Sequence, residues 1–205
     1  MTSNTSTSAT ENRSLRWRTV DIVVASVLAV ACGIIFLVWN SVGYAWFLAM
    51  DNLTPGLGGM ATGIWLLGGI LGGLIIRKPG AAIYVELLAA CVSAVLGSQW
   101  GISTLYSGLA QGVGAEIVFA LFLYRRFSLP VAALAGFGAG LGAYILELFT
   151  SGNLARSMEF KVIYFVTETV SGILLAGVVG YFLVLALART GALDRFAVGR
   201  QHRAR

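Results

Sequence analysis

Charged side chains are scarce in this sequence. Asp, Glu, Lys and Arg make up 11% of its 205 residues, whereas 58% of the residues are hydrophobic. A soluble domain carries about 25% charged residues. Long apolar runs with so few charges exclude an ordinary water-soluble fold and indicate a polytopic membrane protein.

Histidine and cysteine are rare as well. The single histidine, His202, lies in a basic C-terminal tail, and the two cysteines, Cys32 and Cys91, lie within apolar runs. This pattern indicates neither a His/Cys/Asp metal cluster nor a disulfide. The sequence also lacks a G-x-x-x-x-G-K-[ST] phosphate loop and a G-x-S-x-G nucleophile elbow. We therefore expect no cofactor, no metal site and no enzyme activity.

Six apolar segments have about the length that a bilayer requires. They cover residues 19–42, 57–76, 81–96, 102–124, 130–150 and 160–188. The expected fold class is an all-α membrane protein, a bundle of six transmembrane helices within residues 16–189. A polar, disordered tail (1–15) is expected before the bundle and a basic cytoplasmic tail (190–205) after it.

The net charge of +5 could indicate a nucleic-acid partner, but the cations lie between the apolar segments, which points to membrane topology instead. Six spans place both termini on one side. Only two of the 14 Lys and Arg residues, Arg156 and Lys161, then fall on the other side. Because positive charge marks the cytoplasmic side, both termini are expected in the cytoplasm. The aromatic outer connection 43–56 would form either a lid over a pocket or an interfacial belt.

Four glutamates interrupt the apolar segments, although a carboxylate in hydrocarbon costs roughly 2.5–3.5 kcal/mol on insertion scales. Counting along the helices places Glu147 and Glu168 in an outer polar layer with Gln111, and Glu86 and Glu116 in an inner layer. Aromatic side chains share the depth of the outer layer. Carboxylates beside aromatic walls suit a flat heterocycle that is cationic or carries an amino group.

The candidate substrate-binding residues are therefore Glu168, Glu147, Gln111, Trp39, Trp65, Trp100, Tyr106 and Tyr164. Two alternatives stay open for them. The carboxyl groups could be neutral and hydrogen bonded between helices, and the tryptophans could anchor the helices at the membrane interface.

Small residues recur four positions apart in the first segment, at Ala25, Ala29 and Gly33. Such a stripe lets a second helix approach closely. The stripe either packs the bundle or receives a helix of a partner subunit.

Three stretches carry a family resemblance: TVDIVVASVLAVACGIIF, GIWLLGGILGGLIIRKPGAA and LGSQWGISTLYSGLAQGVGAEIVFALF. They resemble the YkoE family, which are S components of energy-coupling-factor (ECF) vitamin importers of prokaryotic plasma membranes. The match covers about residues 16–185, and the run from Arg77 to Glu116 is its most specific part.

The resemblance implies a six-helix protein that captures thiamine or its hydroxymethylpyrimidine precursor on the outer side. It implies a transmembrane T subunit and two ATPase subunits as partners. It also favours the docking role for Ala25, Ala29 and Gly33. The alternatives are a self-sufficient secondary carrier for a small cationic or amino-bearing solute, and an assembly protein without a ligand.

Overall fold

The computed structural model describes residues 14–203, and its regular elements in that range are helices, with no strand. They are α1 (Thr19–Leu53), η1 (Leu57–Leu66), α2 (Leu67–Ile76), α3 (Ala81–Val95), α4 (Ser103–Leu121), α5 (Leu129–Thr150), η2 (Asn153–Ala155), α6 (Met158–Ser171), η3 (Gly172–Val178), α7 (Val179–Arg189) and α8 (Ala197–Arg203). Of these, η1 and η2 are 3₁₀ helices and η3 is a π-helix. The all-α class is confirmed, whereas most of the tail expected to be disordered lies outside the described residues.

Four helical stretches are long and apolar enough to cross a membrane. They are α1, the η1–α2 stretch Leu57–Ile76, α5, and the α6–η3–α7 stretch Met158–Arg189. Helix α3 is apolar but has only 15 residues. The chain is thus helical in each of the six predicted segments, and the number that cross the bilayer stays a prediction.

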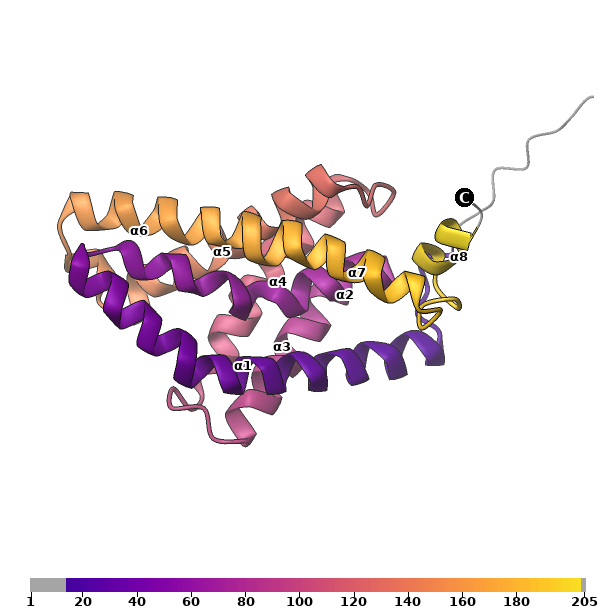
Figure 1. Cartoon of the computed structure of the whole chain (residues 1–205), viewed down its shortest axis with the longest axis horizontal. Coiled ribbons are helices and arrows are strands. Elements are labelled where there is room, and N and C mark those ends of the chain that lie inside the picture. Colours follow the sequence, from indigo (N-terminus) through magenta and orange to yellow (C-terminus); the bar gives the residue numbers. More distant parts are fainter. Residues whose placement is uncertain (1–13, 204–205) are drawn as a thin grey trace, which may run out of the picture.

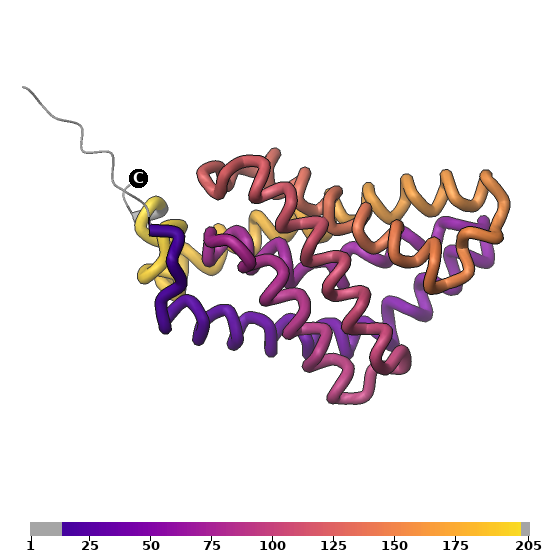
Figure 2. The backbone as a smooth tube through the Cα atoms, turned by 180° about the vertical axis from the view of Figure 1, so that it is seen from behind, coloured from indigo at the N-terminus to yellow at the C-terminus, as the bar shows by residue number. Residues whose placement is uncertain are grey.

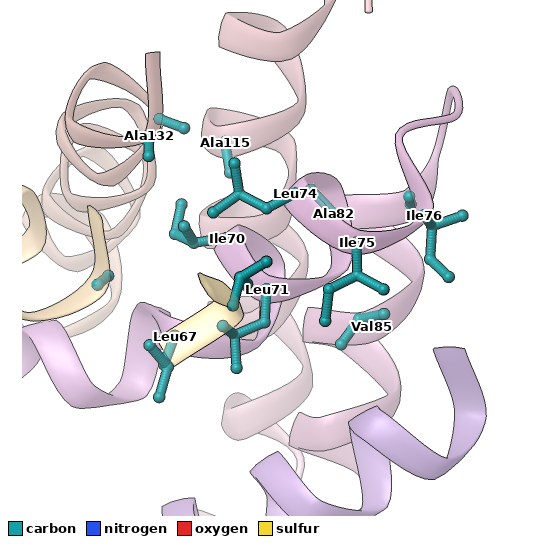
Figure 3. Packing of buried hydrophobic residues seen from close by; sticks show 14 of the residues in the cluster. Leu67, Ile70, Leu71, Leu74, Ile75, Ile76, Ala82, Val85, Ala115 and Ala132 are labelled. Atoms are coloured by element: carbon teal, nitrogen blue, oxygen red, sulfur yellow. The ribbon is translucent and has the colours of Figure 1, made fainter. Parts of the chain in front are cut away.

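Helix α2 forms the centre of the bundle. Its ten residues are buried, from Leu67 to Ile76. In Figure 3, Leu71 and Leu74 lie between side chains from several other helices, among them Val85 of α3 and Ala115 of α4. A helix that is apolar on all sides is stable only when neighbours surround it, so the remaining helices are arranged around α2.

Helix α1 is longer than the sequence predicted. It continues through the expected outer connection 43–56 as far as Leu53, and it bends on the way (Figure 1). Pro55 explains the position of its end, because a proline disfavours helical backbone in the preceding residue. The backbone N–H of Gly56 then donates to Asp51 Oδ1 at 2.7 Å. The prediction that residues 43–56 form a loop was therefore wrong for residues 43–53, which are helical.

Helices α3 and α4 form a hairpin that crosses the other helices obliquely (Figures 1 and 2). Glycines bring α4 against α5: a Cβ atom at Gly114 would lie 2.0 Å from the carbonyl oxygen of Gly138. A similar contact joins α5 to the π-helix, where a Cβ at Gly136 would lie 2.2 Å from the carbonyl oxygen of Gly172. Glycines of α4, α5 and η3 therefore bring the backbones of neighbouring helices into direct contact.

The described chain begins and ends at the same end of the bundle, seen at the left of Figure 2. There, fully buried Asp21 accepts hydrogen bonds from the backbone N–H of Arg18 at 2.7 Å and from the side chains of Arg18 and Lys78. The hydrogen bond to Asp21 raises the pKa of the Arg18 guanidinium above its ordinary value. Asp21 thereby joins the start of α1 to the α2–α3 turn.

The predicted basic tail is folded in its described part. Leu193, Phe196 and Val198 are buried, and α8 packs against α7 and α2. Arg77 in the α2–α3 turn donates to Gln201 Oε1 at 2.9 Å. The tail therefore covers the C-terminal end of the central helix α2.

Replacing Gly114 by alanine should separate α4 from α5, because the new methyl group would overlap the Gly138 carbonyl. We expect a loss of about 1–3 kcal/mol in unfolding free energy, the usual cost of overpacking. Thermal unfolding in detergent, followed by circular dichroism, measures it. Ile117→Ala is the matched control on the same helix, since Ile117 is 55% exposed. Equal stability of the two variants would contradict the close contact.

Candidate substrate-binding site

A cavity of about 510 Å³ opens between the helices. It is lined by side chains of α1, η1, α3, α4, α5 and α6, and by residues of the α3–α4 and α5–α6 connections such as Trp100 and Asn153. Ligand sites for small molecules span about 300–1,000 Å³. The cavity thus has the size of a site for one small organic molecule.

Aromatic side chains follow one another along the cavity wall. The Trp65 ring meets the Trp100 ring edge-on, with 5.6 Å between centroids, and Trp100 meets Tyr44 at 5.2 Å. Tyr44 stacks on Phe47, and Phe47 meets Tyr164 edge-on. A wall of contacting rings offers faces on which a flat or cationic ligand can stack.

Trp65 is held in place by a hydrogen-bond chain. Its indole N–H donates to Asn40 Oδ1 at 2.8 Å, and the Asn40 amide donates to Ser93 Oγ at 3.1 Å. Asn40 is buried and Ser93 is fully buried. The chain joins η1, α1 and α3, so the orientation of the ring is fixed from three elements.

Four carboxylates line the cavity, and their partners differ: Asp51 accepts from the backbone N–H of Gly56, and the other three are Glu86, Glu147 and Glu168. Glu147 accepts a hydrogen bond from the Tyr164 hydroxyl. One oxygen of Glu86 accepts from the backbone N–H of Gly69, and the other has no partner among the described residues. Both oxygens of Glu168 lack a partner there, although this side chain is fully buried. An unpaired buried carboxylate is costly, so Glu168 is the group in this cavity that most needs a donor.

Glu116 lies elsewhere and has a structural role. Its two oxygens accept from the backbone N–H groups of Gly80 and Ala82, at 2.7 and 2.8 Å, and from the Tyr124 hydroxyl at 2.8 Å. The two backbone donors lie at the start of α3, where a helix has unsatisfied N–H groups and favours negative charge. Glu116 therefore caps α3.

Seven of the eight predicted binding residues line this one cavity: Glu168, Glu147, Gln111, Trp65, Trp100, Tyr106 and Tyr164. Trp39 is not among the lining residues. Its N–H donates to the Ala61 carbonyl at 2.9 Å, and its ring meets Trp65 at 6.5 Å. Trp39 thus supports Trp65 from behind.

The sequence-based prediction missed part of the lining. Tyr44, Phe47 and Asp51 line the cavity. They follow Asn40 along the same face of α1, at the spacing of successive helical turns. Their spacing is the signal that could have found them, and it is visible only once residues 43–53 are read as helix. Glu86, which was assigned to an inner layer with Glu116, also belongs to the cavity.

The small-residue stripe is occupied within the chain. Ala25 and Ala29 are fully buried, and a Cβ at Gly33 would lie 2.7 Å from Val92 of α3. The stripe therefore packs α1 on α3, and a partner's helix cannot reach it in this conformation. This corrects the docking role expected from the resemblance. The exposed face of α1 is aliphatic instead, with Val27 and Val38 at least 60% exposed.

Comparisons with known proteins agree with this architecture. A family model for the permease component of an ABC-type cobalt transport system matches residues 20–142. The putative HMP/thiamine permease protein YkoE of Bacillus subtilis (strain 168) is 35% identical over 190 residues, which are 90% of this chain and 92% of that protein. The chain belongs to the YkoE family.

A solved structure agrees with this assignment. The crystal structure of an S-component of ECF transporter superposes with a TM-score of 0.79 at 33% identity, covering 92% of this chain and 94% of that one. Membership of the YkoE family makes the chain a membrane transport component rather than an enzyme. The resemblance seen in the sequence is thereby confirmed.

Glu116→Gln should destabilise the protein and leave the cavity unchanged. A carboxamide has one acceptor oxygen in place of two, so α3 loses part of its cap. We expect a loss of about 1–3 kcal/mol in unfolding free energy. Thermal unfolding in detergent measures this loss, with Glu159→Gln, an exposed glutamate in the first turn of α6, as the control. A variant as stable as the wild type would show that the cap contributes nothing.

Proposed function

We propose that this protein is the S component that captures a cationic, amino-bearing heterocycle, thiamine or hydroxymethylpyrimidine, from the outer side of a prokaryotic plasma membrane. The observation that carries the proposal is Glu168, a fully buried carboxylate without a partner in an aromatic-lined cavity. A ligand with an N–H donor satisfies this group, and a ring beside it stacks on the wall.

Glu168 is a better receptor for an aminopyrimidine than Glu147. Glu147 already accepts from Tyr164, whereas both oxygens of Glu168 lack a partner among the described residues. An amino group and a protonated ring nitrogen would match its two oxygens in a paired hydrogen bond. Trp65 and Trp100, Gln111 and Tyr106 would enclose the ring system, with Trp39 holding Trp65.

The name of the relative and the description of the family model suggest different cargoes, HMP or thiamine and cobalt. Among residues 14–203, no group of three or more His, Cys, Asp or Glu side chains could hold a metal ion. The aromatic wall gives a reason to prefer an organic cation. The donor set of the cavity therefore supports the vitamin-type ligand.

The proposed topology has six spans within residues 16–189 and both termini in the cytoplasm. Three observations support it. First, this topology places twelve of the 14 Lys and Arg residues on one side of the membrane. Second, the described chain starts and ends at one end of the bundle. Third, the α3–α4 and α5–α6 connections, which line the cavity, lie on the opposite side of the membrane in this topology. The cavity then opens outward.

Delivery inward would require partners. An S component of an ECF transporter is expected to act with a transmembrane T subunit and two ATPase subunits, since the chain carries no phosphate loop of its own. Because Ala25, Ala29 and Gly33 are buried, the T subunit would contact another surface.

Intrinsic tryptophan fluorescence tests ligand capture. Titration of the purified chain with thiamine, and separately with hydroxymethylpyrimidine, should give saturable quenching, because Trp65 and Trp100 line the cavity. Glu168→Gln should weaken binding by about tenfold to a hundredfold, the effect of losing a charged hydrogen bond. Val170→Ala is the control, on the same helix and 45% exposed. No response to either compound up to about millimolar, a level worth only about 4 kcal/mol, would remove the vitamin proposal.

Uptake into proteoliposomes separates an S component from a self-sufficient carrier. We expect the chain alone to bind radiolabelled thiamine without accumulating it, and accumulation to need the T subunit and ATPases with ATP. Accumulation by the chain alone, lost in Glu168→Gln, would instead establish the secondary carrier.

A further inference from the structure

The end of the bundle at which the described chain begins and ends presents positive charge only (Figure 2). Its exposed charged side chains are all arginines: Arg16, Arg18, Arg125, Arg126, Arg189, Arg195 and Arg200. Among residues 14–201, for which the structure describes side-chain exposure, the one exposed acid is Glu159, which lies in the first turn of α6 at the opposite end (Figure 1). A surface of one charge sign attracts partners of the other sign, so this end suits an anionic partner.

The α4–α5 connection differs from the rest of this surface. Arg125 and Arg126 are adjacent and exposed, and neither forms an ion pair with another described residue. Exposed leucines precede them, since Leu121, the last residue of α4, is 75% exposed and Leu123 is 64% exposed. Arginines pair well with phosphate groups. Two arginines beside two leucines therefore match a phosphate headgroup and its acyl chains, whereas a free phosphate would use the arginines alone.

The other face of the same connection is anchored in the protein. The Tyr124 hydroxyl donates to Glu116 at 2.8 Å, and the Phe127 ring stacks on Phe119 with 5.8 Å between centroids. The guanidinium of buried Arg77, at the C-terminal end of α2, lies 4.7 Å from the centroid of the Phe127 ring. Aromatic side chains thus hold the connection from within, while its leucines and arginines stay exposed.

The backbone of the connection is strained. Leu123 and Tyr124 have φ angles of 52° and 54°, in the left-handed region that is costly for residues with a Cβ atom. Helices often end on one such residue, usually glycine, but here two consecutive residues with large side chains adopt this conformation. Strained backbone persists where the surrounding structure holds it, and it clusters at functional sites. Strain and anchoring together fix a surface of leucines and arginines.

The structure assigns residues 121–126 the binding of anionic phospholipids of the cytoplasmic leaflet. Arg125 and Arg126 bind the headgroup phosphate, and Leu121 and Leu123 lie among the acyl chains. This inference goes beyond the proposed ligand and rests on the topology given with the proposed function, which places this end in the cytoplasm. The distribution of Lys and Arg that supports the topology does not distinguish these two arginines from the others, whereas the exposed leucines and the fixed turn do.

Lipid retention by the full chain tests the inference. The chain is incubated in mild detergent with equimolar phosphatidylglycerol and phosphatidylcholine, and the lipids that stay bound are counted by native mass spectrometry. We expect the wild type to prefer phosphatidylglycerol. Arg125→Gln/Arg126→Gln should reduce this preference by about fivefold for each arginine, the contribution of one cation near an anionic membrane surface.

Arg195→Gln/Arg200→Gln is the matched control, because it removes the same charge from exposed arginines of the same end. It should change the preference by less than about twofold. Glycerol phosphate, which has the phosphate without acyl chains, should not displace the lipid. The inference is overturned if the wild type has no preference, if both double variants lose the preference equally, or if glycerol phosphate displaces the lipid.

Circular dichroism of the same samples reports whether each variant is folded. If Arg125→Gln/Arg126→Gln does not fold, the two single variants replace it, and an unchanged lipid preference in both would also overturn the inference. Thiamine and hydroxymethylpyrimidine titrations of the wild type keep the two proposals apart. A chain that prefers phosphatidylglycerol but binds neither compound would refute the proposed function and support the lipid site.

Discussion

A carboxylate buried in a hydrocarbon environment must find donors, and this requirement explains the arrangement of the polar groups in the bundle. Glu116 is satisfied by the first turn of α3 and by Tyr124. Glu86 is satisfied at one oxygen by α2, and Glu147 accepts from Tyr164. Glu168 has no partner within the described chain. The series runs from an acid whose two oxygens are both hydrogen bonded to one without a protein partner, which we propose binds the ligand.

The bundle can hold these acids because its central helices pack through glycine. Close contacts such as Gly114 with Gly138 leave little space between α4 and α5, while aromatic residues such as Trp65 and Trp100 line the cavity. Non-α backbone adjoins the site as well, since η1 carries Trp65 and the π-helix η3 follows α6 directly after Ser171. π-helical segments are frequent at functional sites, and here the segment starts four residues after Glu168.

Much of this site could be predicted from the sequence, because a glutamate or a tryptophan in an apolar segment stands out. Counting residues along a helix gives the expected depth of a side chain; it assigns Glu168, Glu147 and Trp65 to one layer, and all three line one cavity. It does not give the direction in which a side chain points. For this reason Glu86 and Glu116 were placed together, whereas one lines the cavity and the other caps a helix.

The other differences have similar causes. A stripe such as Ala25, Ala29 and Gly33 shows that some helix approaches closely, but the pattern is the same for a helix of this chain and for a partner's helix. The continuation of α1 through residues 43–53 was missed because aromatic residues there resemble an interfacial loop, although no proline occurs before Pro55.

The most direct test of this account is a structure of the chain bound to thiamine. The account predicts the aminopyrimidine within hydrogen-bond distance of both Glu168 oxygens, about 2.7–3.2 Å, with its ring against Trp65 or Trp100. A ligand bound elsewhere, with Glu168 still without a donor, would contradict it.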